Sequence, residues 1–306
     1  MTEATQRATR LDTRPVFFGR FSIDVPTAMD LQTQRYTIGR VAIEDIASPV
    51  NDATFDALWK TKRQTIAAER NEDTKQTATI VEETDLGRDA RALFYHGTQF
   101  SDAFWSVQAL VRNDTAAAWL LIEDVKAPLG ELKAEITNVV KALSLGSAAS
   151  PPPASGFSAG RWRVAMAPTS GEEAFVRFIR RADVADVPRE LKIRTHVVEV
   201  VAERGLVERF SNLAGGLFVK LGVGTETVRS GERELAGLAG DEVIAKLKDE
   251  QSTMIGFKWE YHGTANAATK PAITIEAQSD DRNANAIVRA WDSTLGSLRS
   301  TSPTGR

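Results

Sequence analysis

Short runs of alternating apolar and polar residues recur along the chain and end at glycine, proline or asparagine, which is typical of antiparallel strands. The run FFGRFSIDVP at 17–26 places Ile23 and Val25 between polar neighbours and ends at Pro26, so it predicts a short strand after a Gly-Arg-aromatic lead-in. A similar phrase, AGRWRVAMAP, stands at 159–168. Two stretches of the chain therefore begin with a similar sequence pattern.

The first stretch predicts further strands and two helices. A second strand is expected at 35–46, and residues 51–71 predict a helix because Phe55, Trp59 and Ile66 recur at roughly helical spacing. Strands are then predicted by QTATIVEETDL, RDARALFYHGT, AFWSVQALVRND and AAAWLLIEDV, and a closing helix by PLGELKAEITNVVKALSLG.

The second stretch repeats this order. A helix is predicted at 189–205, although its β-branched residues lower its helix propensity. Strands are predicted by ETVRSGERELAGL, AGDEVIAKLKD, IGFKWEYHGT and PAITIEAQS, and a closing helix by NANAIVRAWDSTLGSLRS. We infer a tandem duplication of an α+β unit, in which two helices pack on one face of a mainly antiparallel sheet of about five or six strands. Two unrelated α+β domains with the same order of elements are the alternative.

A proline-rich segment separates the two stretches. GSAASPPPASG at 146–156 has no periodic pattern and contains three consecutive prolines, which favour an extended, semi-rigid linker. We therefore predict an N-terminal α+β domain at 15–146, a linker at 147–156 and a C-terminal α+β domain at 157–301. The length of 306 residues agrees with two domains.

Charge and composition exclude several function classes. The chain has 38 Lys and Arg against 41 Asp and Glu, so no broad basic surface is expected and nucleic acid is not a predicted partner. The absence of cysteine excludes disulfides, thiolate nucleophiles and cysteine-based metal sites. No run approaches the roughly 20 apolar residues that cross a bilayer, so membrane insertion is not expected. The first residues show no export signal, which leaves the cytoplasm open, or the periplasm if a signal has been removed.

No residue pattern predicts a catalytic, cofactor-binding or metal site. His96, His196 and His262 lack a second histidine or a carboxylate at the spacings that zinc uses on a helix, and the nucleophile-elbow and phosphate-loop patterns are absent. Glu82 and Glu83 are consecutive on a predicted strand and so point to opposite faces. A hydrolase or transferase with an unrecognised pair of carboxylates stays open, because any chain this acidic contains candidates.

Aromatic and arginine side chains are the candidates for contact with a protein partner. Trp259 and Trp291 fall within regular elements and are expected in the core. Phe100 stands between polar residues in a predicted loop, Trp105 follows it, and RFIRRAD contains three arginines close together. The predicted partner-binding residues are Phe100, Trp105, Arg177, Arg180 and Arg181.

Several phrases together resemble a known family. FFGRFSIDVP, and then ELAGLAGDEV, FKWEYHG, KPAITIEAQ and IVRAWDSTLGSLR, resemble the two-domain immunity proteins that accompany lipase effectors of the type VI secretion system, specifically the partners of the fourth lipase family. In that family a glycine-rich phrase, a Trp-Glu strand, a proline-led strand and a helix with Trp-Asp follow one another. Here these features fall on Ala236 to Glu242, Trp259 and Glu260, Pro271 to Glu276, and Trp291 and Asp292. Ala239 stands where a proline is usual.

The resemblance implies an inhibitor and not an enzyme. Such a protein binds its cognate lipase or phospholipase effector, clamps it between two domains and blocks access of the substrate. The family's usual compartment is the periplasm, and no cofactor is implied. An adaptor protein of another envelope system is a further alternative, which differs only in its partner.

Overall fold

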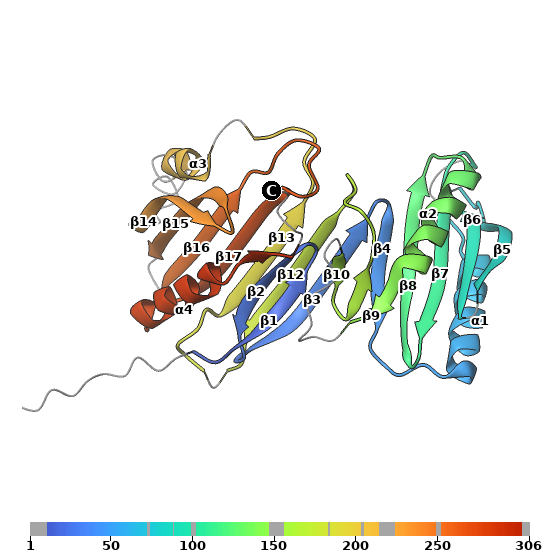
Figure 1. Cartoon of the computed structure of the whole chain (residues 1–306), viewed down its shortest axis with the longest axis horizontal. Helices are drawn as coiled ribbons and strands as arrows, with labels where there is room; N and C mark the ends of the chain where they lie inside the picture. Colours follow the sequence, from blue (N-terminus) through green and yellow to red (C-terminus); the bar gives the residue numbers. More distant parts are fainter. Residues whose placement is uncertain are drawn as a thin grey trace, which may run out of the picture.

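Figure 1 shows the fold in a computed structural model. The structure describes residues 11–71, 74–87, 89–98, 102–146, 156–182, 184–202, 205–213, 224–248 and 252–301. The predicted linker at 147–156 lies, apart from Gly156, outside the described residues. Phe100 also lies outside them. None of the helices within the described ranges combines the length and the apolar character that a membrane span requires.

One large antiparallel sheet runs through the whole molecule. Within the described residues it has twelve strands in the order β14-β15-β16-β17-β13-β12-β3-β4-β8-β7-β6-β5. The first half contributes β3 (Met29–Ile38), β4 (Val41–Ile46), β5 (Thr79–Gly87), β6 (Ala90–His96), β7 (Trp105–Asn113) and β8 (Ala116–Val125). The second half contributes β12 (Glu173–Arg180), β13 (Glu190–His196), β14 (Gly224–Leu235), β15 (Leu238–Lys248), β16 (Thr253–Tyr261) and β17 (Ala272–Asp280). The predicted α+β class is confirmed, and the eight strands predicted in the two later series all form.

Two small sheets join the halves. In each of them, the last strand of one half pairs with a hairpin of the other half. The first contains β1 (Thr13–Phe18), β2 (Phe21–Pro26) and β18 (Arg299–Ser300), and the second contains β9 (Leu143–Leu145), β10 (Phe157–Ala159) and β11 (Trp162–Val164). The strand that ends the second half thus pairs with the hairpin that opens the first, and the strand that ends the first half pairs with the hairpin that opens the second. The central pair of the large sheet, β3 with β12, also crosses between the halves.

The repeated opening phrase is a hairpin and not a single strand. Gly19 takes a φ of 54° and Gly160 a φ of 63°, the left-handed conformation that glycine adopts without strain, and each begins the turn between two strands. The strand predicted after the lead-in forms as β2, whereas the lead-in residues Phe17 and Phe18 belong to a further strand, β1, that was not predicted. The strand predicted at 35–46 is likewise two strands, β3 and β4, joined at Gly39, whose φ is 61°. In each phrase the glycine is part of the turn and not a lead-in.

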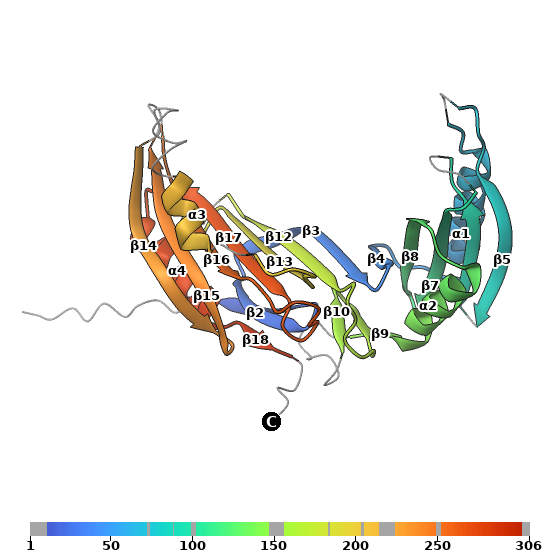
Figure 2. The same ribbon diagram turned by 90° about the horizontal axis from the view of Figure 1, so that it is seen from above.

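The helices cover opposite faces of the sheet, so the prediction of two helices on one face was wrong. The helices are α1 (Asp52–Ala68), α2 (Leu129–Ala142), α3 (Leu206–Leu213) and α4 (Ala284–Gly296). Figure 2 shows a strongly bent sheet with α1 and α3 on its inner side and α2 and the small sheets on its outer side. The helix α4 packs on β2 and β17 within the outer core. We call these two sides the inner face and the outer face.

The helix α1 forms where the sequence predicts it. Asn51 caps its first turn by accepting a hydrogen bond from the backbone N–H of Thr54, and the Thr54 hydroxyl in turn accepts one from the N–H of Asn51. Its buried residues Phe55, Trp59 and Ile66 pack in one cluster with side chains of β6, β7 and β8. The helix predicted at 189–205 does not form: Glu190–His196 is β13, which buries alternate side chains, as strands with one covered face do.

The outer core is continuous across the two halves. One cluster of buried side chains extends from α2 and β8 through β3 and β12 to β16, β17 and α4. Within it the hairpins touch at Gly19 and Ser158, whose backbones exchange hydrogen bonds of 2.9 and 2.7 Å. The predicted domains at 15–146 and 157–301 therefore share a core, and we keep that division only as a proposal about two units in the sequence.

A buried ion pair also joins the halves. Arg20, in the first hairpin, is 2% exposed and donates from Nε and Nη2 to the two carboxylate oxygens of Glu172 at 2.7 and 2.6 Å. Glu172 is 6% exposed and also accepts from the backbone N–H of Thr169 at 2.9 Å. Each carboxylate oxygen thus has a donor, as a buried charge requires.

We expect Glu172→Gln to lower the free energy of unfolding by about 2 kcal/mol, because the amide group cannot accept all of these hydrogen bonds and Arg20 keeps a buried charge. Urea denaturation measures this loss. Glu131→Gln is the matched control: its side chain is 62% exposed and lies 4.0 Å from Arg40, so stability should change by less than about 0.5 kcal/mol. Equal stability of the two variants would contradict a structural role for the pair.

Candidate functional site

Within the part of the chain that the structure describes, no helix covers the centre of the inner face between α1 and α3 (Figure 2). Residues Arg35 of β3, Phe175 of β12 and Arg194 of β13 lie opposite one another in the pairing and form one row across that centre. Arg35 and Arg194 are exposed and Phe175 is half-buried. Arg194 pairs with the exposed Glu173 at 3.0 Å. An aromatic ring between two guanidinium groups is a composition enriched in protein–protein interfaces.

A second row of charged side chains lies beside it. Arg177 of β12 and Lys192 of β13 both contact Glu190, at 2.5 and 3.3 Å, and Gln278 of β17 donates to the same carboxylate at 2.6 Å. Burial alone would raise the pKa of Glu190, but the hydrogen bonds from Arg177 and Lys192 outweigh it and lower that pKa. Glu190 therefore stays ionised and fixes the positions of the two cations around it.

The charged row continues onto the strands beneath α3. Lys258 of β16 lies 3.0 Å from Glu276 of β17 and 3.3 Å from Glu260, which also contacts Arg209 of α3. Burial would raise the pKa of Glu260, but the charges of Lys258 and Arg209 lower it. Most of these groups are neutralised by a neighbour, so the surface presents a pattern of paired charges and not one strong field.

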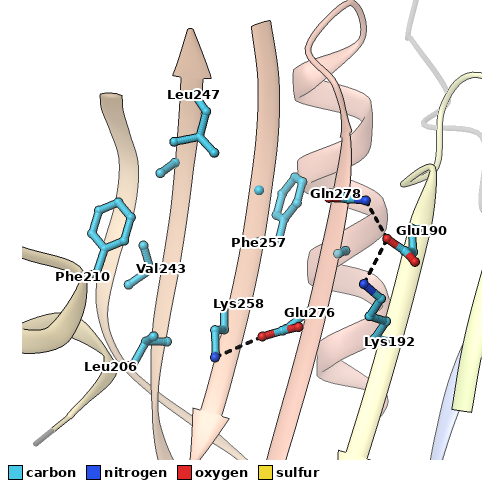
Figure 3. A pocket seen from close by; sticks show the side chains of 13 residues that line it. Glu190, Lys192, Leu206, Phe210, Val243, Leu247, Phe257, Lys258, Glu276 and Gln278 are labelled. Atoms are coloured by element: carbon cyan, nitrogen blue, oxygen red, sulfur yellow. Dashed lines mark hydrogen bonds and ion pairs between the residues drawn. The ribbon is translucent and has the colours of Figure 1, made fainter. Parts of the chain in front are cut away.

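A trough opens on the inner face between α3 and this charged row. Its volume is about 300 Å³, at the low end of ligand-sized pockets. Figure 3 shows apolar side chains on one side of it and charged side chains on the other. The lining residues, which we call the inner trough, are Glu190, Lys192, Leu206, Phe210, Val243, Ala245, Leu247, Gly256, Phe257, Lys258, Glu276, Ala277 and Gln278.

The residues on which the family resemblance rests lie on the outer face of the sheet and in the core. Trp259 is buried, and its ring lies so close to Gly240 that an added Cβ would come within 2.6 Å of it. Trp291, also buried, donates from Nε1 to Glu242 at 2.7 Å, and Asp292 pairs with the arginines of β14. The expectation that both tryptophans belong to the core is confirmed. These residues build the second half, and Glu242 and Asp292 also line a pocket of about 540 Å³ together with Arg229 and Arg233.

The predicted partner-binding residues do not gather in one place. Arg177 lies on the inner face in the charged row, with 41% of its side chain exposed. The side chain of Arg180 is 14% exposed and donates hydrogen bonds to the backbone carbonyls of Ala185 and Val187. It therefore stabilises the loop between β12 and β13. Arg181 is half exposed and lies 3.8 Å from Asp30. Trp105 belongs to the outer core beside His96 and is separated from β12 by β3, β4 and β8.

Metal binding or acid–base catalysis by the described residues would depend on how their His, Asp and Glu side chains are arranged. No group of three or more His, Asp or Glu side chains there is placed to hold a metal ion. The carboxyl groups with a shifted pKa in the same ranges are all shifted downward, so each stays ionised and none is suited to act as a general acid. Burial lowers the pKa of His196, and the charge of Arg194 lowers it further.

Sequence reasoning missed the inner trough. The floor of the trough contains Ala245 and Gly256, which face each other across β15 and β16. A glycine in the interior of a predicted strand often marks a close approach of another group, and that signal at Gly256 was available. The apolar wall of the trough comes largely from α3, which was not predicted at residues 206–213.

Comparisons with known proteins show the family and the fold. The family model described as "Tle cognate immunity protein 4 C-terminal domain" matches residues 150–302, half of the chain. No curated protein sequence matches. The apo structure of the immunity protein TplEi of the type VI secretion system from Pseudomonas aeruginosa is similar, with 19% identity, a TM-score of 0.77 and coverage of 96% of this chain and 98% of that one.

Two further structures have the same fold. The Tle4-Tli4 complex contains a chain with 18% identity, a TM-score of 0.77 and coverage of 96% of this chain and 98% of that one. TplEi complexed with an "L" peptide gives 17% identity, a TM-score of 0.72 and coverage of 94% and 98%. The shared fold, the matched domain and the site geometry lead to one conclusion: the chain belongs to the Tle cognate immunity protein 4 family.

Proposed function

We propose that this immunity protein binds a cognate lipase effector of the type VI secretion system on the inner face of its bent sheet and blocks access of the lipid substrate. Proteins of this family are inhibitors and not enzymes. One of the structures with this fold is of a Tle4-Tli4 complex, which supports an effector of the Tle4 kind as the partner.

The observation that carries this proposal is the contrast between the two faces. The outer face is covered by α2, α4 and the small sheets, and its side chains are buried in one core. The inner face bends around an open centre, where Arg35, Phe175 and Arg194 are accessible (Figure 2). A concave surface bounded by α1 and α3 suits a protein partner held from two sides, as two linked patches bind more tightly than either alone.

The cations of the inner face favour an acidic surface on the effector. Arg35, Arg177, Lys192 and Arg194 lie on three neighbouring strands together with two carboxylates, Glu173 and Glu190. Of the predicted partner-binding residues, Arg177 has the position that this proposal requires, and we retain Arg181 as a candidate at the edge of the same region. We further propose that the complex forms in the periplasm, as the family resemblance implies.

The test is to mix the purified protein with the lipase encoded beside it. We expect a stable complex of nearly one-to-one composition in size-exclusion chromatography and loss of phospholipase activity. The variant Arg35→Glu with Arg194→Glu should weaken binding by about tenfold or more, because it reverses two exposed charges at the centre of the inner face. Lys141→Glu, an exposed position on α2 at the outer face, is the matched control.

Absence of any complex with the wild-type protein would refute the proposal. Equal weakening by the inner and the outer charge reversals would place the contact elsewhere. For the compartment, fractionation of the host with a periplasmic marker checks the proposal, and recovery of the protein with the cytoplasmic marker would contradict it.

A further inference from the structure

The inner face of the large sheet is covered to different extents in the two halves of the molecule. In the first half, α1 spans Asp52–Ala68 and buries Phe55, Trp59 and Ile66 against three strands, so the inner face there is closed. In the second half, α3 spans Leu206–Leu213, and the cluster that it forms within the described residues holds side chains of α3 and β15 alone. The inner face of β16 and β17 is not closed by α3 and forms the inner trough.

Small residues on the sheet deepen the inner trough. Gly256 has no side chain, and a Cβ added there would find one atom within 4 Å, the carbonyl oxygen of Ala245 at 4.0 Å. The equivalent face in the first half carries Leu93 and Leu110, which fill the space beneath α1. Among the described residues, the second half therefore has an open space where the first half has a filled one.

The two walls of the trough have different chemistry. Leu206 and Phe210 of α3 and Val243 of β15 form an apolar wall, and Figure 3 shows it opposite Lys258, Glu276 and the pair of Glu190 with Lys192. An apolar wall beside a row of alternating charges complements an amphipathic helix, whose apolar and polar faces are parallel. An extended lipid chain has no polar groups that could contact the ion pairs of the charged wall.

We propose that the inner trough seats one amphipathic helix of the effector, in the place relative to the sheet that α1 occupies in the first half. The apolar side of that helix lies against Leu206, Phe210 and Val243, and its polar edge follows Lys258 and Glu276. This assignment rests on the proposed function, because the helix belongs to the effector.

The first experiment fills the trough. Gly256→Leu places a side chain in the open space, where the nearest atom to its Cβ is 4.0 Å away, so the fold is expected to persist. We expect the dissociation constant for the lipase encoded beside the protein to rise by about tenfold or more, because the added side chain excludes the apolar side of the effector helix from the trough. Gly130→Leu is the matched control, because its Cβ meets nothing within 4 Å and lies on α2 at the outer face; its constant should stay within about twofold of the wild type.

The outcomes separate this inference from the proposed function. If the wild-type protein does not bind the lipase, the proposed function is wrong. If wild type and Gly256→Leu bind equally, the function stands and the trough assignment is wrong. Leu247→Glu, a half-buried trough position, repeats the test if Gly256→Leu lowers the melting temperature. A lipid site is the outcome if lysophosphatidylcholine displaces the lipase from wild type, and that result would also overturn the assignment.

The second experiment identifies the occupant. Because the chain has no cysteine, Lys258→Cys gives a single attachment point for a maleimide photo-crosslinker. We expect crosslinks at effector positions three or four residues apart, the spacing of one helix face. Lys141→Cys on the outer face should give none. Crosslinks at every second residue, as an extended strand gives, would refute a helical occupant.

Discussion

Separate expression of residues 1–146 and 156–306 should give two fragments that do not fold on their own. The first fragment lacks β12, the partner of β3, and the second lacks the β1-β2 hairpin, whose strand β2 pairs with β18. We expect neither fragment to show a cooperative unfolding transition, whereas coexpression should yield one particle with the summed mass of the two fragments.

The expectation follows from the apolar surface that the split exposes. Phe18, Phe21, Ile23, Val25 and Met29 of the first half are all nearly fully buried in the shared outer core. Each such side chain contributes roughly 1.5–3 kcal/mol when buried, so their loss is on the order of 10 kcal/mol. That figure matches the entire stability of a typical domain.

The matched control cuts the folded protein. A protease site inserted at 147–155, between the halves, should be cleaved while the fragments stay associated in size-exclusion chromatography, because the exchanged strands still pair. Thermal denaturation of the cleaved protein should remain a single transition. Two fragments that each unfold cooperatively would show that the halves are independent domains, and the shared core would then contribute little.

The sequence predicts the positions of strands and helices better than it predicts which strands pair with each other. The strands β5 to β8 and β14 to β17 follow from alternation and turn residues, and α1 follows from its cap at Asn51 and its apolar spacing. Exchange of β9 and β18 between the halves does not follow, because both strands are short and no local pattern selects their partners. The hairpin turns at Gly19 and Gly160 carry a readable signal, a glycine followed by a polar residue within an apolar run.

The arrangement of helices on both faces also has a sequence signal. The strand β6 contains the continuous apolar run Leu93, Phe94 and Tyr95, and a strand that is apolar at consecutive positions is buried on both faces. The candidate site is less predictable. Arg35, Phe175 and Arg194 are far apart in the sequence, and only the pairing of β3, β12 and β13 brings them into one row. Trp105 and Arg180 were predicted as interface residues from their residue type, and in the fold both are partly or largely buried.

Replacement of Trp291 by alanine should lower the free energy of unfolding by about 3–5 kcal/mol, because the side chain is 1% exposed and its removal leaves a cavity in the outer core. The ring packs against Phe257 with centroids 5.3 Å apart, and Nε1 donates to Glu242. Urea denaturation measures the loss. Trp105→Ala is the matched control, since that tryptophan is only partly buried, and its loss should be smaller.

Trp291→Phe separates packing from hydrogen bonding in the same side chain. Phenylalanine keeps most of the ring but not the donor, and Glu242 keeps its contacts with Arg229 and Arg233 at 2.7 Å each. The loss should therefore be about 1.5 kcal/mol, well below that of the alanine variant. Because Trp291 contributes to the outer core and not to the inner face, effector binding by folded Trp291→Phe should equal that of the wild type. Unchanged stability together with lost binding would instead assign Trp291 to the effector interface, and the outer face would then have to be reconsidered as the contact surface.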